Sequence, residues 1–142
     1  MNDYTKQAED FLQATGTTFT VIYQYTGPYF QGDKEKRDVF RFTLKNAKGE
    51  YSSTFGDSIR NTEDRAKRAK GYKKPSAYDI LACLEKYEPD TFENWCRECG
   101  YDEQPLSEYP KVLKVWTDCV EQFRGLRKIF SEEQMEQLRE IS

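Results

Sequence analysis

Two different periods of hydrophobic residues divide this sequence near residue 60, and they constrain the fold more than any other feature. Between residues 17 and 55, apolar and polar residues alternate, which is typical of strands with one face in a core. After residue 75, apolar residues recur every three or four positions, which is typical of amphipathic helices. Strands followed by a block of helices indicate an α+β fold rather than alternating βαβ units.

The first half predicts one helix followed by a three-stranded antiparallel meander. The helix runs from about residue 3 to residue 14, and Gly16 follows it, where a left-handed helix stop is least costly. Strands are expected at residues 17–26 and 39–45. A tight turn, Asn-Ala-Lys-Gly, then leads into a third strand at 50–55. The apolar stripe of the helix comprises Tyr4, Ala8, Phe11 and Leu12.

Two short helices are expected after the meander. Ser76 is a cap, with Asp79 three residues later, and the apolar residues that follow extend this helix to about Lys86. Thr91 can cap the second short helix, which Gly100 ends.

The C-terminal part predicts a helical hairpin. Ser131 and Gln134 match a capping box, so a last helix begins there and buries Met135, Leu138 and Ile141. The long helix before it gives the strongest periodic signal in the chain. Its apolar stripe comprises Val112, Val115, Trp116, Cys119, Phe123, Leu126 and Phe130.

The chain length of 142 residues fits a single domain. We divide it into a helix with a β-meander (1–59), a basic segment (60–74) and a helical subdomain (75–142). Ten Tyr, nine Phe and two Trp supply large side chains for a core, although 33% of residues are charged. No apolar run approaches the roughly 18 residues of a membrane span, and the first residues lack a signal-peptide pattern, so the expected compartment is the cytoplasm.

The four cysteines are the first candidates for chemistry, because Cys96 and Cys99 have the C-x-x-C spacing of zinc and redox sites. The chain has no histidine, so a zinc site would need Cys83 and Cys119, at gaps unlike those of a known zinc finger. Each cysteine instead coincides with a predicted apolar helix face, where a free thiol packs as a small hydrophobe. Core packing is therefore favoured, zinc and redox chemistry stay as alternatives, and no cofactor is expected.

Motifs of catalysis are absent from the sequence. Without histidine, a Ser or Cys nucleophile would need a Lys or carboxylate base, and neither Ser-x-x-Lys nor Gly-x-Ser-x-Gly occurs. A phosphate-binding P-loop is also missing. The many carboxylates of the second half favour charged, solvated helix faces, and a metal-dependent or acid–base site is the alternative. We therefore expect a protein that is not an enzyme.

The basic segment is the most suggestive surface feature. It carries seven Lys or Arg against two acidic residues, whereas residues 75–142 carry eight basic and fifteen acidic residues. A helix here would place several cations along one side, which suits nucleic-acid phosphates or an acidic protein partner. A solvated surface is the other interpretation. The candidate partner-binding residues are Arg60, Arg65, Lys67, Arg68, Lys70, Lys73 and Lys74.

Three stretches of the sequence carry a family resemblance. They are Phe-Gly-Asp-Ser-Ile-Arg-Asn-Thr at 55–62, Lys-Pro-Ser-Ala-Tyr-Asp-Ile-Leu-Ala-Cys-Leu at 74–84, and Phe-Glu-Asn-Trp-Cys at 92–96 with Gly-Tyr-Asp at 100–102. Together they resemble a family of short, mostly uncharacterised proteins of bacteriophages and prophages. The likeness spans most of the chain from Phe19 onward.

This resemblance implies a phage accessory protein in the cytoplasm of a bacterial host. Small proteins of that kind often block host defences, so the expected function is an anti-CRISPR-like inhibitor that occludes a host defence nucleoprotein complex. Either the acidic helical half or the basic segment would be its contact surface. The alternative function is a nucleic-acid-binding accessory protein in phage replication or regulation, acting through the basic segment. The sequence leaves the oligomeric state open.

Overall fold

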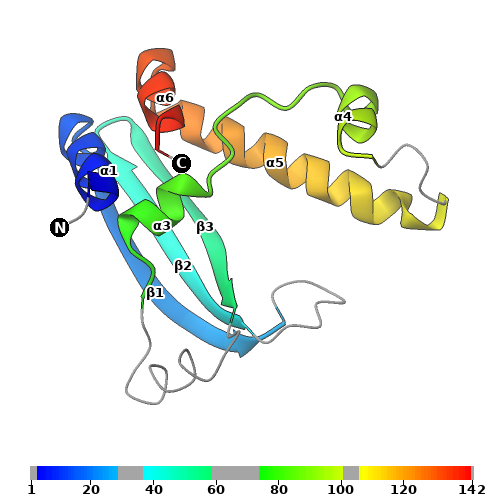
Figure 1. Cartoon of the computed structure of the whole chain (residues 1–142), viewed down its shortest axis with the longest axis horizontal. Coiled ribbons are helices and arrows are strands. Elements are labelled where there is room, and N and C mark those ends of the chain that lie inside the picture. Colours follow the sequence, from blue (N-terminus) through cyan, green and yellow to red (C-terminus); the bar gives the residue numbers. More distant parts are fainter. Residues whose placement is uncertain (1–2, 29–36, 59–73, 101–105, 142) are drawn as a thin grey trace.

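The structure is a computed structural model that describes residues 3–28, 37–58, 74–100 and 106–141 (Figure 1). It confirms the predicted α+β class, with an N-terminal helix, a three-stranded antiparallel sheet and then helices. The elements are α1 (Asp3–Ala14), β1 (Thr18–Gly27), β2 (Arg37–Asn46), β3 (Gly49–Ser58), α3 (Ala77–Ala82), α4 (Phe92–Glu98), the 3₁₀ helix η1 (Leu106–Glu108), α5 (Tyr109–Ile129) and α6 (Glu132–Arg139).

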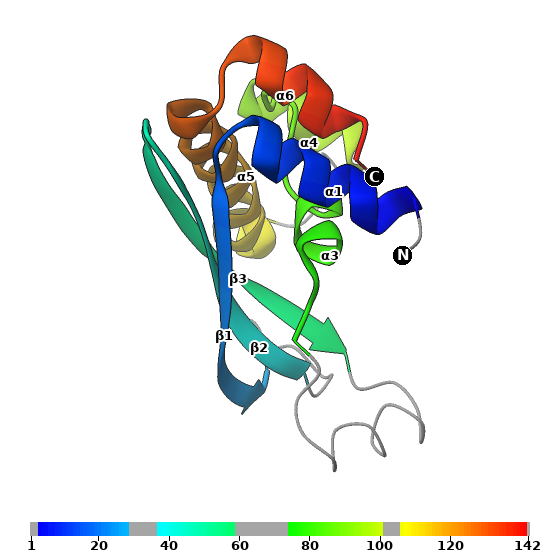
Figure 2. The same ribbon diagram turned by 90° about the vertical axis from the view of Figure 1, so that its left-hand side faces the viewer.

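The sheet has the strand order β1-β2-β3, and both neighbouring pairs are antiparallel. The two hairpin residues Asn46 and Gly49 lie opposite each other, as the turn sequence predicts. A β-bulge interrupts the register between Tyr23 and Tyr25, and it leaves Tyr25 exposed. Figure 2 shows α1, α3 and α6 over one face of the sheet.

The core lies between that face and the helices. Phe42 and Leu44 of β2 point into it, and the rings of Phe11 and Phe130 meet edge to face at 5.1 Å. Helices from both ends of the sequence contribute to this cluster, since it includes Leu12 of α1 and Met135 of α6. Its other fully buried members include Ala8, Ile80, Leu81, Leu126, Ile129, Met135 and Leu138.

The predicted helix starts are confirmed. The Ser76 hydroxyl accepts a hydrogen bond from the Asp79 N–H at 3.2 Å, and the Asp79 carboxylate accepts one from the Ser76 N–H at 2.9 Å. Ser131 and Gln134 form the same reciprocal pair at α6. Two-residue signals of this kind act locally and need no tertiary context.

The predicted end of α3 is wrong, because the helix stops at Ala82 rather than near Lys86. Cys83 is its C-cap, and the Cys83 N–H donates to the Ile80 carbonyl in a tighter terminal turn. The following residues run as a loop along α5, where the Glu85 N–H donates to Gln122 Oε1 at 2.6 Å. A tertiary contact therefore replaces the last turn of the expected helix.

Helix α5 joins two parts of the molecule. At 1.5 Å per residue its 21 residues span about 30 Å. Its C-terminal half packs on β3, where Gly125 lies directly against the ring of Tyr51. Its N-terminal half projects from the sheet together with α4 (Figure 1). Val115, in this projecting half, is 45% exposed although it belongs to the expected apolar stripe; Tyr4, of the expected stripe of α1, is also exposed, to 59%.

Within the described ranges, no helix has both the length and the apolar character needed to cross a bilayer.

Candidate functional site

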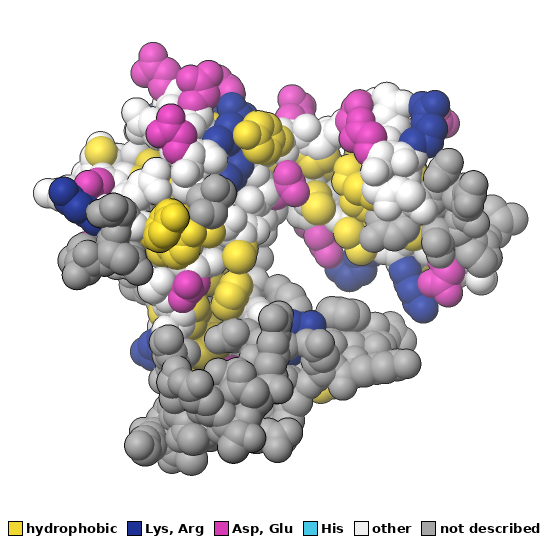
Figure 3. All heavy atoms as spheres, viewed as in Figure 1, with side chains coloured by type: hydrophobic (Ala, Val, Ile, Leu, Met, Phe, Trp, Pro, Cys, Tyr) yellow, Lys and Arg dark blue, Asp and Glu magenta, His cyan; other side chains and the backbone are white. Residues whose placement is uncertain are grey.

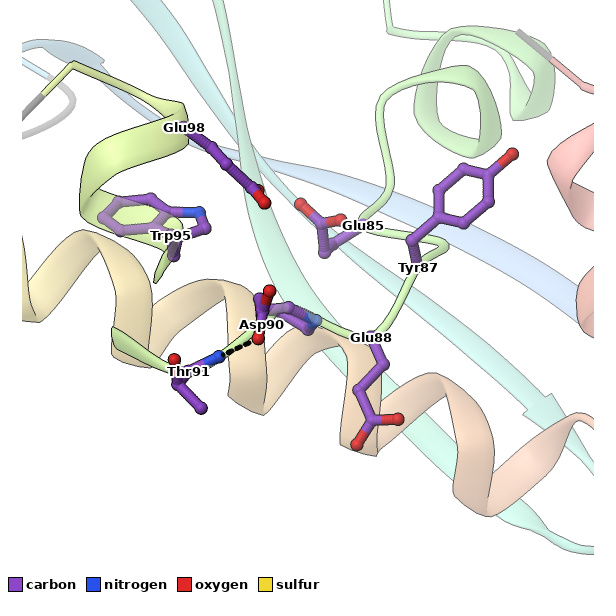
Figure 4. A pocket seen from close by; sticks show the side chains of 8 residues that line it. Glu85, Tyr87, Glu88, Asp90, Thr91, Trp95 and Glu98 are labelled. Carbon is purple, nitrogen blue, oxygen red and sulfur yellow. Dashed lines mark hydrogen bonds between the residues drawn. The ribbon is translucent and has the colours of Figure 1, made fainter. Parts of the chain in front are cut away.

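A cleft of about 690 Å³ lies between the loop that follows α3 and the helix α4 (Figure 4). The loop contributes Glu85 and residues 87–91, and α4 contributes Trp95 and Glu98. Four carboxylates line the cleft, and none of its described lining residues is basic. The acidic residues are Glu85, Glu88, Asp90 and Glu98.

The floor of this acidic cleft is fixed to one face of α5. The Trp116 Nε1–H donates to the Asp90 carbonyl at 3.0 Å. The Cys119 thiol donates to the Glu85 carboxylate, and Gln122 accepts from the Glu85 N–H. These three α5 residues are three positions apart and so lie along one side of the helix. The loop is therefore held at its beginning and near its end.

Lys86 fixes the same loop to the sheet-bearing part of the molecule. Its side chain is 6% exposed, and its ammonium donates to the carbonyls of Ala82 and Ile141. Burial lowers the pKa of Lys86, because few polar groups replace the water around its charge. The Lys86 carbonyl in turn accepts from Arg139 Nε at 3.0 Å. The basic residue between two acidic ones thus points away from the cleft.

Aromatic packing positions the opposite wall. The Phe92 ring lies 5.4 Å from that of Tyr109 and 5.5 Å from that of Trp116, in edge-to-face arrangements. It also stacks on Trp95 at 6.5 Å. No residue of α4 is fully buried, so this cluster carries most of the contact between α4 and α5.

The carboxylates differ in direction. Figure 4 shows the side chains of Glu85, Asp90 and Glu98 directed toward one space beside the Trp95 ring, whereas Glu88 points outward. Asp90 also contacts the start of α4, since its Oδ1 accepts from the N–H of the N-cap residue Thr91 at 2.7 Å. In Figure 3, carboxylates and hydrophobic side chains lie side by side over α4. Several carboxylates around one hollow with an aromatic wall give it a negative potential, which favours a cationic group.

The prediction that the carboxylates lie on helix faces is therefore wrong for Glu85, Glu88 and Asp90, which lie in the loop, whereas Glu98 is an exposed residue of α4. Tertiary contacts of the loop bring these three residues opposite Glu98. Sequence reasoning missed these residues, although the run Glu-Lys-Tyr-Glu-Pro-Asp was a usable signal, since a proline among acids opposes a helix. In the part of the chain that the structure describes, no group of three or more Cys, Asp or Glu is arranged to hold a metal ion.

The prediction of core packing for the cysteines is wrong at two positions. Cys83 and Cys99 are exposed, and each is the C-cap residue of its helix. Cys96 and Cys119 are half-buried. Burial raises the pKa of the Cys119 thiol, and the negative charge of Glu85 raises it further.

The basic segment falls almost entirely outside the described residues. Arg60, Arg65, Lys67, Arg68, Lys70 and Lys73 all lie there, so their predicted partner-binding role stays a prediction. Lys74 is described and exposed, just before Pro75 and the cap of α3.

A second hollow, of about 420 Å³, lies between β3 and the middle of α5. Its charges are of both signs, and Lys114 pairs with Asp118 at 3.1 Å. An exposed i,i+4 pair of this kind is ordinary for a helix surface. The acidic cleft is therefore the better candidate site.

Comparison of the chain with protein-family models, with curated proteins and with solved structures finds no match.

Proposed function

We propose that this protein works by binding, and that its acidic cleft holds a positively charged segment of a macromolecular partner. The observation that supports this most is the convergence of three carboxylates on one space beside Trp95, with no basic residue among the described lining residues. A Lys or Arg side chain entering there would find charge-assisted hydrogen bonds and an aromatic face together.

The anchoring of the cleft supports binding by a prepared surface. Glu85 and Asp90 are held to α5 before any partner arrives, so little loop entropy is lost on association. A hydrogen bond to a charged group contributes about 1.5–3 kcal/mol. A few such contacts can support a specific complex of ordinary affinity.

The resemblance to phage proteins suggests a narrower proposal about the partner. The partner would be a host defence nucleoprotein complex, such as a CRISPR-Cas nuclease, that the protein inhibits in the bacterial cytoplasm. Such complexes hold nucleic acid through rows of Lys and Arg. A surface bearing Glu85, Asp90 and Glu98 can occupy those cations and thereby exclude the phosphates.

The test changes the exposed carboxylates of the cleft and measures binding. The variant Glu88→Lys/Glu98→Lys reverses two charges in the cleft. The control Glu136→Lys/Glu140→Lys makes the same charge change on exposed residues of α6 and its C-cap. Binding to an arginine-rich peptide, followed by interferometry, should weaken about tenfold or more in the cleft variant and little in the control. Equal weakening in both would contradict a defined site.

A second experiment tests the narrower proposal. The protein is added to a purified CRISPR-Cas nuclease, and cleavage of its DNA target is followed with the wild type and both variants. Inhibition that the cleft variant loses and the control retains supports occlusion by the cleft. Peptide binding without inhibition of any defence nuclease would leave the cleft as a binding site and refute the inhibitor role.

The alternative function, nucleic-acid binding through the basic segment, has its own test. It predicts a mobility shift with DNA or RNA that weakens steeply as salt is added. Reversal of Lys67, Lys70 and Lys73 to glutamate should abolish that shift. A chain that causes no retardation at low salt would contradict it.

A further inference from the structure

The strand β1 forms one edge of the sheet, and this edge is open in the described part of the chain. β2 pairs with one side of β1, and Figure 2 shows no described helix or strand over its other side. Along an antiparallel edge, every second residue directs its backbone N–H and C=O outward. Such an edge is a template for another strand.

The two edges of this sheet are protected to different degrees. At the β3 edge, α5 packs against Tyr51, and the strand contains Glu50 and Asp57. β1 contains no charged residue and no proline in its ten positions, Thr-Phe-Thr-Val-Ile-Tyr-Gln-Tyr-Thr-Gly. Charges and prolines are the usual means of preventing edge pairing. The only such device in β1 is the bulge between Tyr23 and Tyr25. The unprotected stretch is therefore 18–22.

This stretch is complementary to itself in an antiparallel pairing. With a two-fold axis at Thr20, each Thr20 faces its copy, and Phe19 faces Val21 of the second chain. On the core side of the sheet, Phe19 and Val21 are half-buried against the core, so the pairing would cover the apolar surface that they still expose. On the outer side, Ile22, which is 57% exposed, would face Thr18 of the second chain. Apolar and β-branched cross-strand pairs are favourable.

The charge distribution favours a second copy at this edge. The chain is acidic overall, so most approaches of two copies bring like charges together. The acidic cleft lies beside α4, and Figure 1 shows α4 and β1 at opposite sides of the molecule. Pairing through the uncharged β1 edge keeps the two clefts far apart. It also leaves both clefts accessible, so the pairing does not depend on the function proposed for them.

We infer that two copies of this chain associate through residues 18–22 of β1 and form a continuous six-stranded antiparallel sheet. Five residues of strand bury less area than a standard interface of about 800 Å² per partner. The dimer is therefore weak, with a micromolar to millimolar dissociation constant, and its population rises with protein concentration.

Sedimentation equilibrium tests the association itself. The weight-average mass should rise above the 16.8 kDa of one chain toward twice that value as the concentration is raised. Thr20→Lys places two like charges at the two-fold axis and should keep the mass at that of the monomer. Gln24→Lys makes the same charge change beyond the bulge, at an exposed residue of the same strand, and should leave association unchanged. Circular dichroism checks that both variants fold.

Cross-linking tests the register. Opposed residues of an antiparallel pair have Cα atoms about 4.5–5.5 Å apart, which a disulfide can span. Under mild oxidation, Thr20→Cys should therefore give a covalent dimer. Thr18→Cys should not, because the two copies of residue 18 would be about 13 Å apart. Both variants keep the native thiols, so these contribute equally. If the wild type stays monomeric up to about 0.5 mM, where weak interfaces are populated, the proposed association is wrong. If Thr20→Cys and Thr18→Cys cross-link equally, the proposed register is wrong.

Discussion

The part of the molecule built on the sheet and the part that projects from it are held together in different ways. The body consists of α1, the three strands, α3, α6 and the C-terminal half of α5, and the arm consists of α4, η1 and the N-terminal half of α5. Among the residues that the structure describes, every large side chain less than 2% exposed lies in the body or directly next to its helices, at Phe130 and Ile141. Among the described residues of the arm, the least exposed apolar side chain is Val112, at 9%.

This difference in packing between body and arm bears on the position of the candidate site. The body is stabilised by continuous aliphatic and Phe packing, whereas the arm relies on the ring cluster around Phe92 and a few hydrogen bonds. Regions with few buried apolar contacts open locally at lower free energy. The acidic cleft lies where the loop from the body meets the arm, so it combines a fixed wall with one that can adapt to a partner.

The largest expected effect comes from truncating a body residue. Phe130→Ala removes a fully buried ring that packs on Phe11, and the free energy of unfolding should fall by about 3–5 kcal/mol. Phe92→Ala is the matched change in the arm. Because Phe92 is only half-buried, its loss should cost about 1–2 kcal/mol. Urea denaturation followed by circular dichroism measures both. Equal losses would mean that arm and body unfold as one equally packed unit.

The next largest effect on stability is expected at the contact between α5 and the sheet. Replacing Gly by Ala in a helix normally stabilises it by about 0.5–1 kcal/mol. A Cβ at Gly125, however, would clash with Cδ1 of Tyr51. Gly125→Ala should therefore destabilise the protein by about 1–3 kcal/mol. Combining it with Tyr51→Ala should remove the clash, so the two changes should be strongly non-additive. Additive losses would show that α5 does not approach β3 this closely.

Asn46 joins three segments of the body, and its replacement should have a smaller effect on stability. Its Nδ2 donates to the Ile129 carbonyl at 2.9 Å and to Thr17 Oγ1 at 3.2 Å, and its Oδ1 accepts from the Lys48 N–H. Asn46→Ala should lower the free energy of unfolding by about 1–2 kcal/mol. Lys48→Ala, at an exposed position in the same turn, is the control and should change it little. A thermal melt that shows no difference between the two variants would contradict this role.

The features of the fold that could be predicted from the sequence are those that short-range signals encode, in the body and in the arm alike. The strands, the meander order and the helix starts at Ser76, Thr91 and Ser131 are confirmed, because alternation and capping are short-range signals. The end of α3 and the exposure of Cys83 were predicted incorrectly. Both depend on contacts with α5, more than thirty residues away, which no local pattern contains.

The acidic cleft was not predicted for a related reason. Its carboxylates come from a loop and from a helix, so no single periodic face carries them. Their convergence is produced by Trp116, Cys119 and Gln122, which in the sequence are indistinguishable from ordinary members of an amphipathic helix. Long-range hydrogen bonds of this kind specify the site more than the acidic residues themselves do.

The smallest expected effect is on the rate at which Cys119 is alkylated. This rate indicates whether the arm stays in contact with the loop. Because burial and then the charge of Glu85 raise the pKa of Cys119, little of this thiol is thiolate near neutral pH. Iodoacetamide should alkylate the exposed Cys83 well before Cys119, as peptide mass spectrometry can measure. The rate at Cys119 should rise only at a pH above the usual thiol range.

The same shift fixes the sign of a small dependence of stability on pH. A thiol whose pKa is higher in the folded state keeps its proton longer than it does in the unfolded chain. Its contribution to stability is therefore present below the ordinary thiol pKa and is lost as the pH rises through the raised value. Glu85→Gln should speed alkylation of Cys119 by removing a negative charge, and Glu88→Gln, which leaves the hydrogen bond of Cys119 intact, should not. If Cys119 reacted as fast as Cys83 in the wild type, the arm would be open for much of the time, and the contrast between a packed body and an anchored arm would fail at this contact.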